Sequence, residues 1–361
     1  MISISSPLID DEEKKAVNQV LDSHMLVQGK KVQEFEDSFA EYIGVQHAVA
    51  TNNGTTALEL SFRSAGLKNG EVITTPFSFI ASANSILYTG AKPVFADIDS
   101  KTFNINPELI EEKITDKTKA ILPVHLYGQS CDMKHIMEIA EKHNLIVIED
   151  SCQAHGAEYN GKRTGSFGTG CFSFYATKNM TTGEGGIITT NNKEIADTAR
   201  ILRNHGQEKR YYHKVLGYNY RMTDIAAAIG IAQLRKLDQI NKKRIENAKK
   251  LNDELSDIKG LITPEIITGN KHIFHQYTLR ITDNFPKTRN EFAEILTKNG
   301  IGSLIYYPVP IHMQEVYKKL GYIDSLPVSE KMAREVISIP VHPKLSEDDI
   351  RKIVDVIRSI K

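Results

Sequence analysis

Short apolar segments rich in β-branched residues recur between residues 47 and 190, and segments with helical spacing separate them. Such segments are typical of buried parallel strands, and their alternation with helices is typical of a doubly wound, mostly parallel α/β sheet. This pattern constrains the fold of the chain more than any other feature does. The predicted strands lie at 47–51, 71–76, 93–99, 119–125, 145–150, 170–177 and 187–190.

Charged residues stand at the ends of two of these strands. Leu145-Ile-Val-Ile-Glu-Asp150 closes with an aspartate, and the strand at 170–177 is followed at once by Lys178. Doubly wound sheets bind ligands beyond the carboxyl ends of their strands, so we expect both side chains at one edge. A lysine that forms a Schiff base and a carboxylate that keeps a pyridine nitrogen protonated are the parts of a pyridoxal phosphate (PLP) site. The alternative is a solvated lysine and a loop-capping aspartate.

Small residues open the helix that follows strand 47–51. Asn52-Asn-Gly-Thr-Thr56 precedes a helical pattern of apolar residues. The free N–H groups and the positive dipole end of such a helix start can bind phosphate. For this stretch taken alone, an ordinary N-cap by Thr55 is the alternative. Because a PLP lysine is predicted elsewhere in the chain, we assign the N–H groups of Gly54, Thr55 and Thr56 to the cofactor phosphate.

The segment Phe172-Ser-Phe-Tyr-Ala-Thr-Lys-Asn-Met-Thr-Thr-Gly-Glu-Gly-Gly186 closely resembles the PLP-lysine segment of the DegT/StrS family of sugar aminotransferases. The resemblance runs over nearly the full length of the chain. It implies an aspartate-aminotransferase-like α/β fold (PLP fold type I), with a seven-stranded, mostly parallel sheet between helices and a smaller C-terminal α+β domain. A change of pattern predicts domains at 1–244 and 245–361, with the N-terminal helix free to pack with the small domain.

Further cofactor-binding residues follow from this resemblance. Phe79 occupies the position of an aromatic residue that stacks on the pyridine ring; the alternative is that Phe77 or Phe79 is plain core. Gln153 is expected at the 3-oxygen of the ring or beneath the ring, and Ser173 is expected to bind the phosphate through its hydroxyl. Asn219 is expected to reach the cofactor phosphate of the other subunit of a homodimer, although a polar loop residue would look the same.

Three residues are candidates for the substrate side of the site. Tyr306-Tyr-Pro-Val-Pro-Ile-His312 resembles a family segment that faces the substrate, and it contains Tyr307 and His312. Glu184 lies in the glycine-rich turn that follows the lysine. For His312, a structural turn is an equally good interpretation.

The lysine at position 178 favours transamination, because some relatives carry histidine there and dehydrate sugars instead. The resemblance implies transfer of an amino group from L-glutamate to a nucleotide-linked keto-sugar, for amino-sugar and surface-polysaccharide biosynthesis. The segments 215–222 and 226–233 resemble members that aminate C4, which we prefer, whereas 205–207 and 210–213 resemble members that aminate C3. A keto-cyclitol aminotransferase and a non-catalytic regulator that binds PLP or a sugar are the alternatives.

Composition argues against several other classes of protein. The chain has 45 basic and 45 acidic residues, so bulk charge gives no support for binding nucleic acid or an anionic membrane. We see no signal peptide and no apolar run of membrane-spanning length, and three scattered cysteines fit a reduced, cytoplasmic protein. The segment 97–108 superficially copies a calcium loop, but Thr102 stands where glycine is needed, so we expect no metal.

Overall fold

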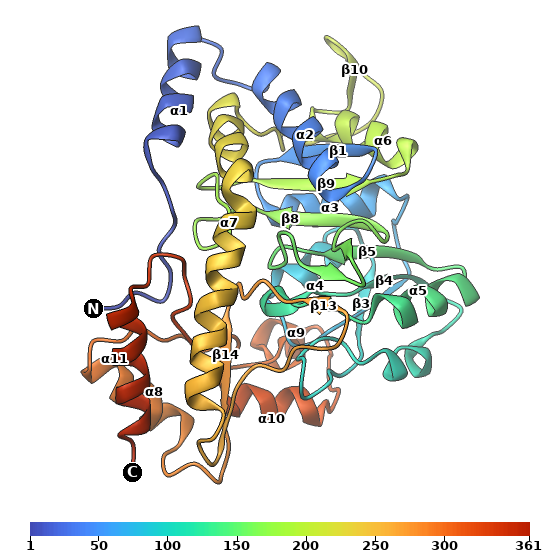
Figure 1. Ribbon diagram of the computed structural model, residues 1–361. Helices are drawn as coiled ribbons and strands as arrows, with labels where there is room; N and C mark the ends of the chain where they lie inside the picture. Colours follow the sequence, from blue (N-terminus) through green and yellow to red (C-terminus); the bar gives the residue numbers. More distant parts are fainter.

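The computed structural model describes residues 1–361, and Figure 1 shows a central sheet flanked by helices, with one long helix running past it into a second group of elements. The sheet has seven strands in the order β1-β9-β8-β5-β4-β2-β3. The strands from β8 to β3 are mutually parallel, and β9 is antiparallel to both of its neighbours. Each strand predicted between residues 47 and 190 is one of these seven: β1 (His47–Thr51), β2 (Glu71–Thr74), β3 (Lys92–Phe95), β4 (Thr118–Leu122), β5 (Ile146–Asp150), β8 (Thr169–Ser173) and β9 (Gly186–Thr190).

The helices surround this sheet and continue beyond it. Their bounds are α1 (Asp11–Ser23), α2 (Lys30–Ile43), α3 (Gly54–Ser64), α4 (Ala81–Leu87), α5 (Met133–Lys142), α6 (Lys193–Arg203), α7 (Asp224–Leu255), α8 (Arg289–Lys298), α9 (Glu315–Lys319), α10 (Pro327–Glu335) and α11 (Glu347–Arg358). Short 3-10 turns are η1 (Pro107–Leu109), η2 (Glu111–Lys113), η3 (Leu126–Gly128) and η4 (Ile311–Met313).

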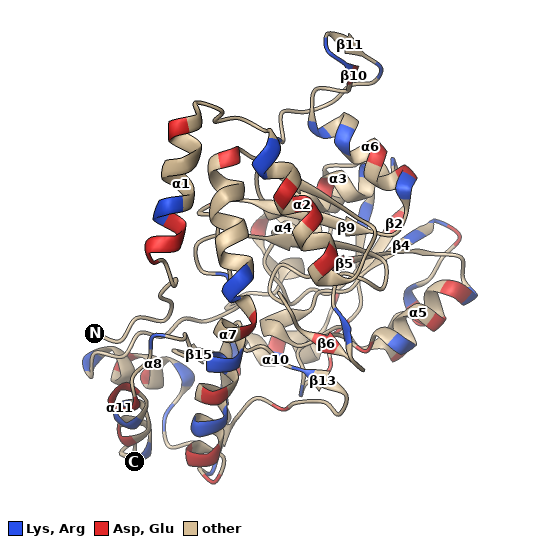
Figure 2. Cartoon of the chain, turned by 45° about the horizontal axis from the view of Figure 1, so that its top comes forward, with Lys and Arg blue, Asp and Glu red and all other residues tan.

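The remaining strands form three small sheets. β12 (Leu261–Ile262), β14 (Tyr277–Ile281) and β15 (Val336–Ile339) make one, β13 (Asn270–Lys271), β6 (Glu158–Tyr159) and β7 (Lys162–Arg163) make another, and β10 (Gln207–Lys209) pairs with β11 (Tyr212–His213). The sequence patterns did not indicate the β10–β11 hairpin, which projects from the body in Figures 1 and 2.

Apolar clusters bury both faces of the central sheet. Neighbouring residues of β9 point to opposite faces: Ile188 packs into the cluster under α3 and α6, and Ile187 packs into the cluster under α2 and α7. Side chains of a strand alternate between its two faces. A strand that is covered on both faces therefore has apolar residues at successive positions. The predicted layering of helix, sheet and helix is therefore confirmed.

The second group of elements has its own apolar cluster, drawn from residues 248–357 and from Ile2. The predicted domain boundary at 244/245 falls inside α7, which runs through both groups in Figure 1. At the N-terminus, Ile2 forms a bridge with Ile301 of the second group. Helix α1 instead packs along α7, where Gln233 donates to Glu13 over 2.7 Å. The division into two domains stays a prediction.

Helix starts follow the capping rules. Capping boxes are present at Asp10 and Ser346. Helix α3, however, is capped by Asn53, whose side chain accepts from the Thr56 N–H over 2.9 Å, and not by Thr55. Asn53 has the extended backbone that an N-cap needs, while Thr55 already lies in the first helical turn.

Charged side chains of both signs are mixed over the outer helices. Figure 2 shows blue and red segments side by side along α5 and along the end of α7 near the C-terminus. No helix combines the length and the apolar character that crossing a membrane requires.

Candidate active site

Asp150 and Lys178 lie at the same edge of the central sheet. β5 ends at Asp150 and β8 ends at Ser173, and the two strands are parallel neighbours in which Asp150 pairs with Cys171. Lys178 follows shortly after β8. The structure thus brings the predicted strand-end pair to the carboxyl edge, where doubly wound sheets bind ligands.

The Asp150 carboxylate is buried and held by two donors. Ser82 donates to Oδ2 over 2.7 Å, and the Cys152 N–H donates to Oδ1 over 3.1 Å. Ser82 also lies 2.9 Å from the hydroxyl of Ser78. Sequence reasoning missed both serines. The available signal was a pair of serines four residues apart, the second of which lies in the first turn of α4. Many ordinary helix starts share this spacing.

Lys178 is half-buried and has no ion-pair partner in the chain. Burial lowers the pKa of its amine, and the neighbouring Cys152 and Asp150 oppose this effect without reversing it. A lowered pKa increases the fraction of neutral amine near neutral pH. The neutral amine is the nucleophile that condenses with an aldehyde.

The start of α3 lies directly against the end of β8. A Cβ on Gly54 would lie 2.6 Å from Ser173 Cβ and 3.1 Å from Cys152 Sγ, so only glycine fits. The N–H groups of Gly54 and Thr55 have no acceptor in the chain, whereas the Thr56 N–H is already bonded to the Asn53 cap. Two free N–H groups beside a serine hydroxyl at a helix start fit a phosphate.

Gln153 connects two other parts of the site. Its Oε1 accepts from the backbone N–H of Tyr127 over 3.0 Å, and its Nε2 donates to the hydroxyl of Tyr307 over 3.1 Å. Burial raises the pKa of the Tyr307 phenol, so Tyr307 remains an uncharged hydroxyl. The predicted cofactor residue Gln153 and the predicted substrate residue Tyr307 therefore touch each other.

The two phenylalanines of the Phe77-Ser-Phe79 segment differ in exposure. Phe77 is fully buried against Phe103, whereas 58% of the Phe79 side chain is exposed. The Phe79 ring lies beside Tyr307, with 6.4 Å between the ring centroids. Phe77 is thus the core residue of the pair, and Phe79 is the one free to cover a ligand.

The other predicted substrate residues lie apart. His312 is 2% exposed; its Nε2 lies 3.4 Å from Glu330, and its ring lies near Phe95. The structure therefore shows a packed turn at His312, and contact of its imidazole with a substrate stays a prediction. Glu184 is exposed in the turn before β9, and Asn219 is exposed in the loop before α7.

A cavity of about 810 Å³ lies elsewhere in the chain. Its lining includes Asp99, Glu108, Asp132 and Glu265 and none of the predicted site residues. Volume alone therefore does not identify the site; the convergent lysine, carboxylate and helix start do.

Comparison with known proteins identifies the family. Residues 7–358 match the model of the DegT/DnrJ/EryC1/StrS aminotransferase family. The chain belongs to this family. As a DegT-family member it is an aminotransferase, and pyridoxal phosphate is its cofactor, in agreement with the free N–H groups beside Ser173 and the lysine with a lowered pKa.

Two relatives of this DegT-family chain have names that refer to nucleotide sugars. A GDP-perosamine synthase of Caulobacter vibrioides is 41% identical over 98% of this chain and 96% of its own length. A dTDP-3-amino-3,6-dideoxy-alpha-D-galactopyranose transaminase of Aneurinibacillus thermoaerophilus is 41% identical over 96% of this chain and 94% of its own length.

A solved structure confirms the fold class of this DegT-family chain. PseC of Helicobacter pylori, an aminotransferase involved in pseudaminic acid biosynthesis, matches with a TM-score of 0.95 at 33% identity and covers 99% of both chains. The expected PLP fold type I is therefore confirmed.

Proposed function

We propose that this aminotransferase moves an amino group from L-glutamate to a nucleotide-linked keto-sugar, with C4 preferred over C3. The observation that carries the proposal is the convergence of Lys178, Asp150 and the Gly54–Ser173 contact at one sheet edge. The names of the two curated relatives support the substrate class. The preference for C4 rests on the resemblance of the segments 215–222 and 226–233.

The residues at the sheet edge divide the chemistry among them. When bound, PLP supplies an electron sink for the carbanion chemistry of transamination. Lys178 would bind the aldehyde carbon of PLP through its amine, and its free amine would move a proton between the donor α-carbon and C4′. Asp150, oriented by Ser82, keeps the pyridine nitrogen protonated.

The remaining cofactor residues bind and orient. The N–H groups of Gly54 and Thr55 and the Ser173 hydroxyl would hold the phosphate, and the exposed Phe79 would stack on the ring. Gln153 uses one Nε2 hydrogen for Tyr307, which leaves its second hydrogen free for the 3-oxygen of the ring.

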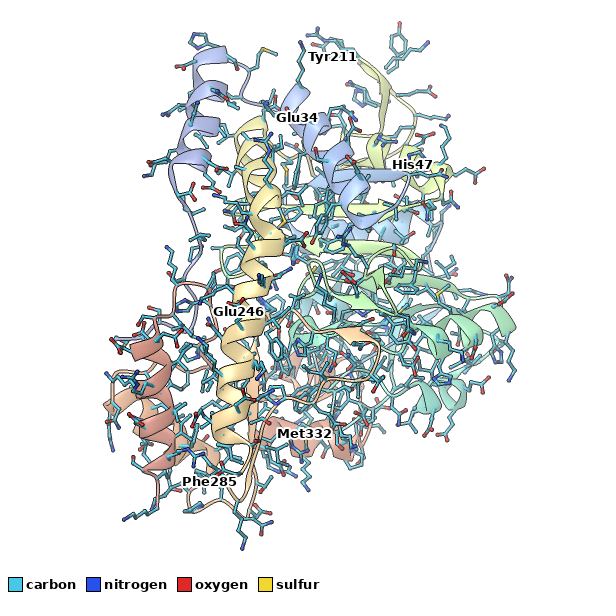
Figure 3. The ribbon with its side chains drawn as sticks, in the orientation of Figure 1. Glu34, His47, Tyr211, Glu246, Phe285 and Met332 are labelled. Atoms are coloured by element: carbon cyan, nitrogen blue, oxygen red, sulfur yellow. The ribbon has the colours of Figure 1, made fainter.

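The proposal includes a homodimer whose two sites lie at the subunit interface. Asn219 is exposed and would contribute to the phosphate site of the other subunit. The nearby β10–β11 hairpin carries large exposed side chains, including Tyr211, which Figure 3 labels at the outer end of the hairpin, and Tyr212. Exposed aromatic side chains on a projecting hairpin favour contact with another chain. Tyr307 and Glu184 are proposed to face the sugar.

Absorption spectroscopy tests the cofactor and the donor together. The protein with PLP should show the visible band of lysine-bound cofactor, and L-glutamate alone should bleach this band. A band that persists would contradict L-glutamate as donor, and a missing band would contradict the role of Lys178. With a nucleotide-linked 4-keto-sugar added, NMR of the product should show nitrogen at C4.

Nucleoside diphosphates separate the two catalytic alternatives. We expect GDP, UDP or dTDP to inhibit competitively against the keto-sugar, since the nucleotide contributes binding energy that does not depend on the sugar. No inhibition by any of the three would favour a keto-cyclitol substrate.

A further inference from the structure

The residue after Lys178 is an asparagine whose side chain is buried and fully hydrogen-bonded. The Asn179 Nδ2 donates to Oδ1 of Asn241 over 2.8 Å and to the carbonyl of Ile273 over 3.2 Å. Its Oδ1 lies 3.3 Å from Nδ1 of His275, which is therefore the donor of that pair. We call Asn179, Asn241 and His275 the Asn179 network.

The Asn179 network reaches the loop that follows Asp150. The Asn241 Nδ2 donates to the carbonyl of His155 over 2.8 Å, and His155 lies in that loop. Asn241 itself belongs to α7, the long helix that runs past the sheet in Figure 1. One series of hydrogen bonds thus links the segment of Lys178 to the segment of Asp150 through a rigid helix.

The network also extends to the segment that carries His275 into β14. In this segment, Ile273 donates to the carbonyl of Gly128 over 2.9 Å and Gln276 donates to the carbonyl of Tyr127 over 3.2 Å. Tyr127 in turn donates to Gln153. The segment at 272–276 therefore holds both the turn that positions Gln153 and the amide next to Lys178.

Burial gives these hydrogen bonds a single arrangement. Each of the three side chains is at most 5% exposed, so water cannot replace a lost partner. The orientations of the Asn179 and Asn241 side-chain amides are fixed, because the Nδ2 of each faces a backbone carbonyl, which can only accept a hydrogen bond. Since Asn179 is bonded covalently to Lys178, its fixed side chain fixes the backbone from which the lysine projects.

We propose that the Asn179 network positions Lys178 for proton transfer. The inference rests on the proposed function, in which Lys178 moves the proton. None of the three residues contacts the reacting atoms; they act through the main chain of Lys178. Loss of the network should leave a lysine that still binds PLP but is displaced from the line between the donor α-carbon and C4′, and such displacement lowers kcat more than it raises KM.

A matched pair of asparagines on one helix tests this proposal. Asn241 and Asn247 are both buried in α7, and both donate to backbone carbonyls, but Asn247 bonds the carbonyls of Val341 and His342 and makes no hydrogen bond to the segments of Lys178 or Asp150. Asn241→Ala and Asn247→Ala therefore remove the same kind of side chain from the same helix, and only Asn241 also accepts from Asn179. Only Asn241→Ala breaks the network.

Two readouts are needed: the pH midpoint of the visible band of lysine-bound PLP, and the kinetics of the glutamate half-reaction. For Asn241→Ala we expect the midpoint to move by about half a pH unit or more. We expect its kcat to fall about tenfold or more, with KM changed by less than about twofold. Asn247→Ala should match the wild type in both. The titratable side chains near the amine are Asp150, Cys152, His155 and His275, and both alanine variants retain all four.

Equal effects of the two alanine variants, or an unchanged midpoint and kcat in Asn241→Ala, would overturn the proposal. If Asn241→Ala does not fold, His275→Phe tests the network through kcat. It keeps a ring of similar shape and removes the Nδ1 donor to Asn179, together with the contact between His275 Nε2 and Gln276. A wild-type protein that shows no visible band with PLP would instead contradict the proposed function. A normal wild-type band with unaffected variants would contradict the network alone.

Discussion

Ser82 donates its hydroxyl hydrogen to Oδ2 of Asp150 over 2.7 Å, although the two residues are separated by 68 positions in the sequence. The bond ties the start of α4 to the end of β5, so the helix fixes the direction of the carboxylate. Because Asp150 is 5% exposed, water does not substitute for this donor.

Ser82→Ala should lower the free energy of unfolding of the apoprotein by about 1–3 kcal/mol, because a buried carboxylate loses a charge-assisted hydrogen bond. Urea denaturation at pH 7 measures the change. Ser85→Ala is the matched control: Ser85 is buried in the same helix, but its hydroxyl only bonds the carbonyl of Ser82 within the helix. Equal losses of unfolding free energy in the two variants would contradict a stabilising role of the bond between Ser82 and Asp150.

The sheet edge could be predicted because its signals are local. Asp150 and Lys178 follow apolar strand runs, and the rule for parallel strands places such residues together. The Ser82–Asp150 and Asn179–Asn241 bonds could not be predicted in this way. They join segments that are distant in sequence, and a buried serine or asparagine has no periodic pattern of its own.

Two further details could not be decided from the sequence, for equally physical reasons. Asn53 and Thr55 are both good N-cap residues, and the choice depends on where β1 leaves the sheet, which propensity does not determine. His312 lies in a segment that resembles the substrate side of the family, and Tyr307 of that segment does approach Gln153. The chain then turns at η4 and buries the His312 ring beside Phe95.

Gly54→Ala should weaken PLP binding about tenfold or more, equivalent to about 1.4 kcal/mol. The added Cβ would meet Ser173 Cβ at 2.6 Å and force α3 away from β8, which separates the helix N–H groups from the serine hydroxyl. Titration with PLP, followed by the visible band, measures the dissociation constant. Thr55→Ala keeps the N–H and adds no atom, so it should bind PLP within about twofold of wild type. Similar weakening in both variants would contradict a phosphate held by backbone N–H groups.

His155 should make the protein sensitive to acid. Burial, with a smaller contribution from the charge of Lys178, lowers the pKa of His155 to about 3 from its ordinary value of 6.5. Between these values the unfolded chain binds a proton that the folded chain excludes. Stability is therefore full above pH 6.5 and falls as the pH decreases from 6.5 towards 3.

His155→Phe removes this titration and keeps a ring between Phe172 and Phe174. Between pH 7.5 and pH 4.5, the wild type should lose about 2–3 kcal/mol more of its unfolding free energy than His155→Phe loses. Chemical denaturation at the two pH values measures the difference. His213→Phe, at an exposed position of the β10–β11 hairpin, should follow the wild type. A wild type and a His155→Phe variant with the same pH dependence would contradict a neutral buried imidazole.

Lys178→Ala and Asn219→Ala test whether the two residues of one site come from different subunits. Each variant alone should be nearly inactive at subsaturating PLP. In a homodimer with shared sites, a heterodimer of the two variants has one doubly altered site and one intact site. Random mixing makes half of the dimers heterodimers, so co-refolded or co-expressed chains should recover about one quarter of the wild-type activity. If Asn219 instead served the site of its own chain, every site in the mixture would carry an alteration and no activity would return. Lys178→Ala mixed with wild type in equal amounts is the control, because there about half of the sites remain intact whichever arrangement holds.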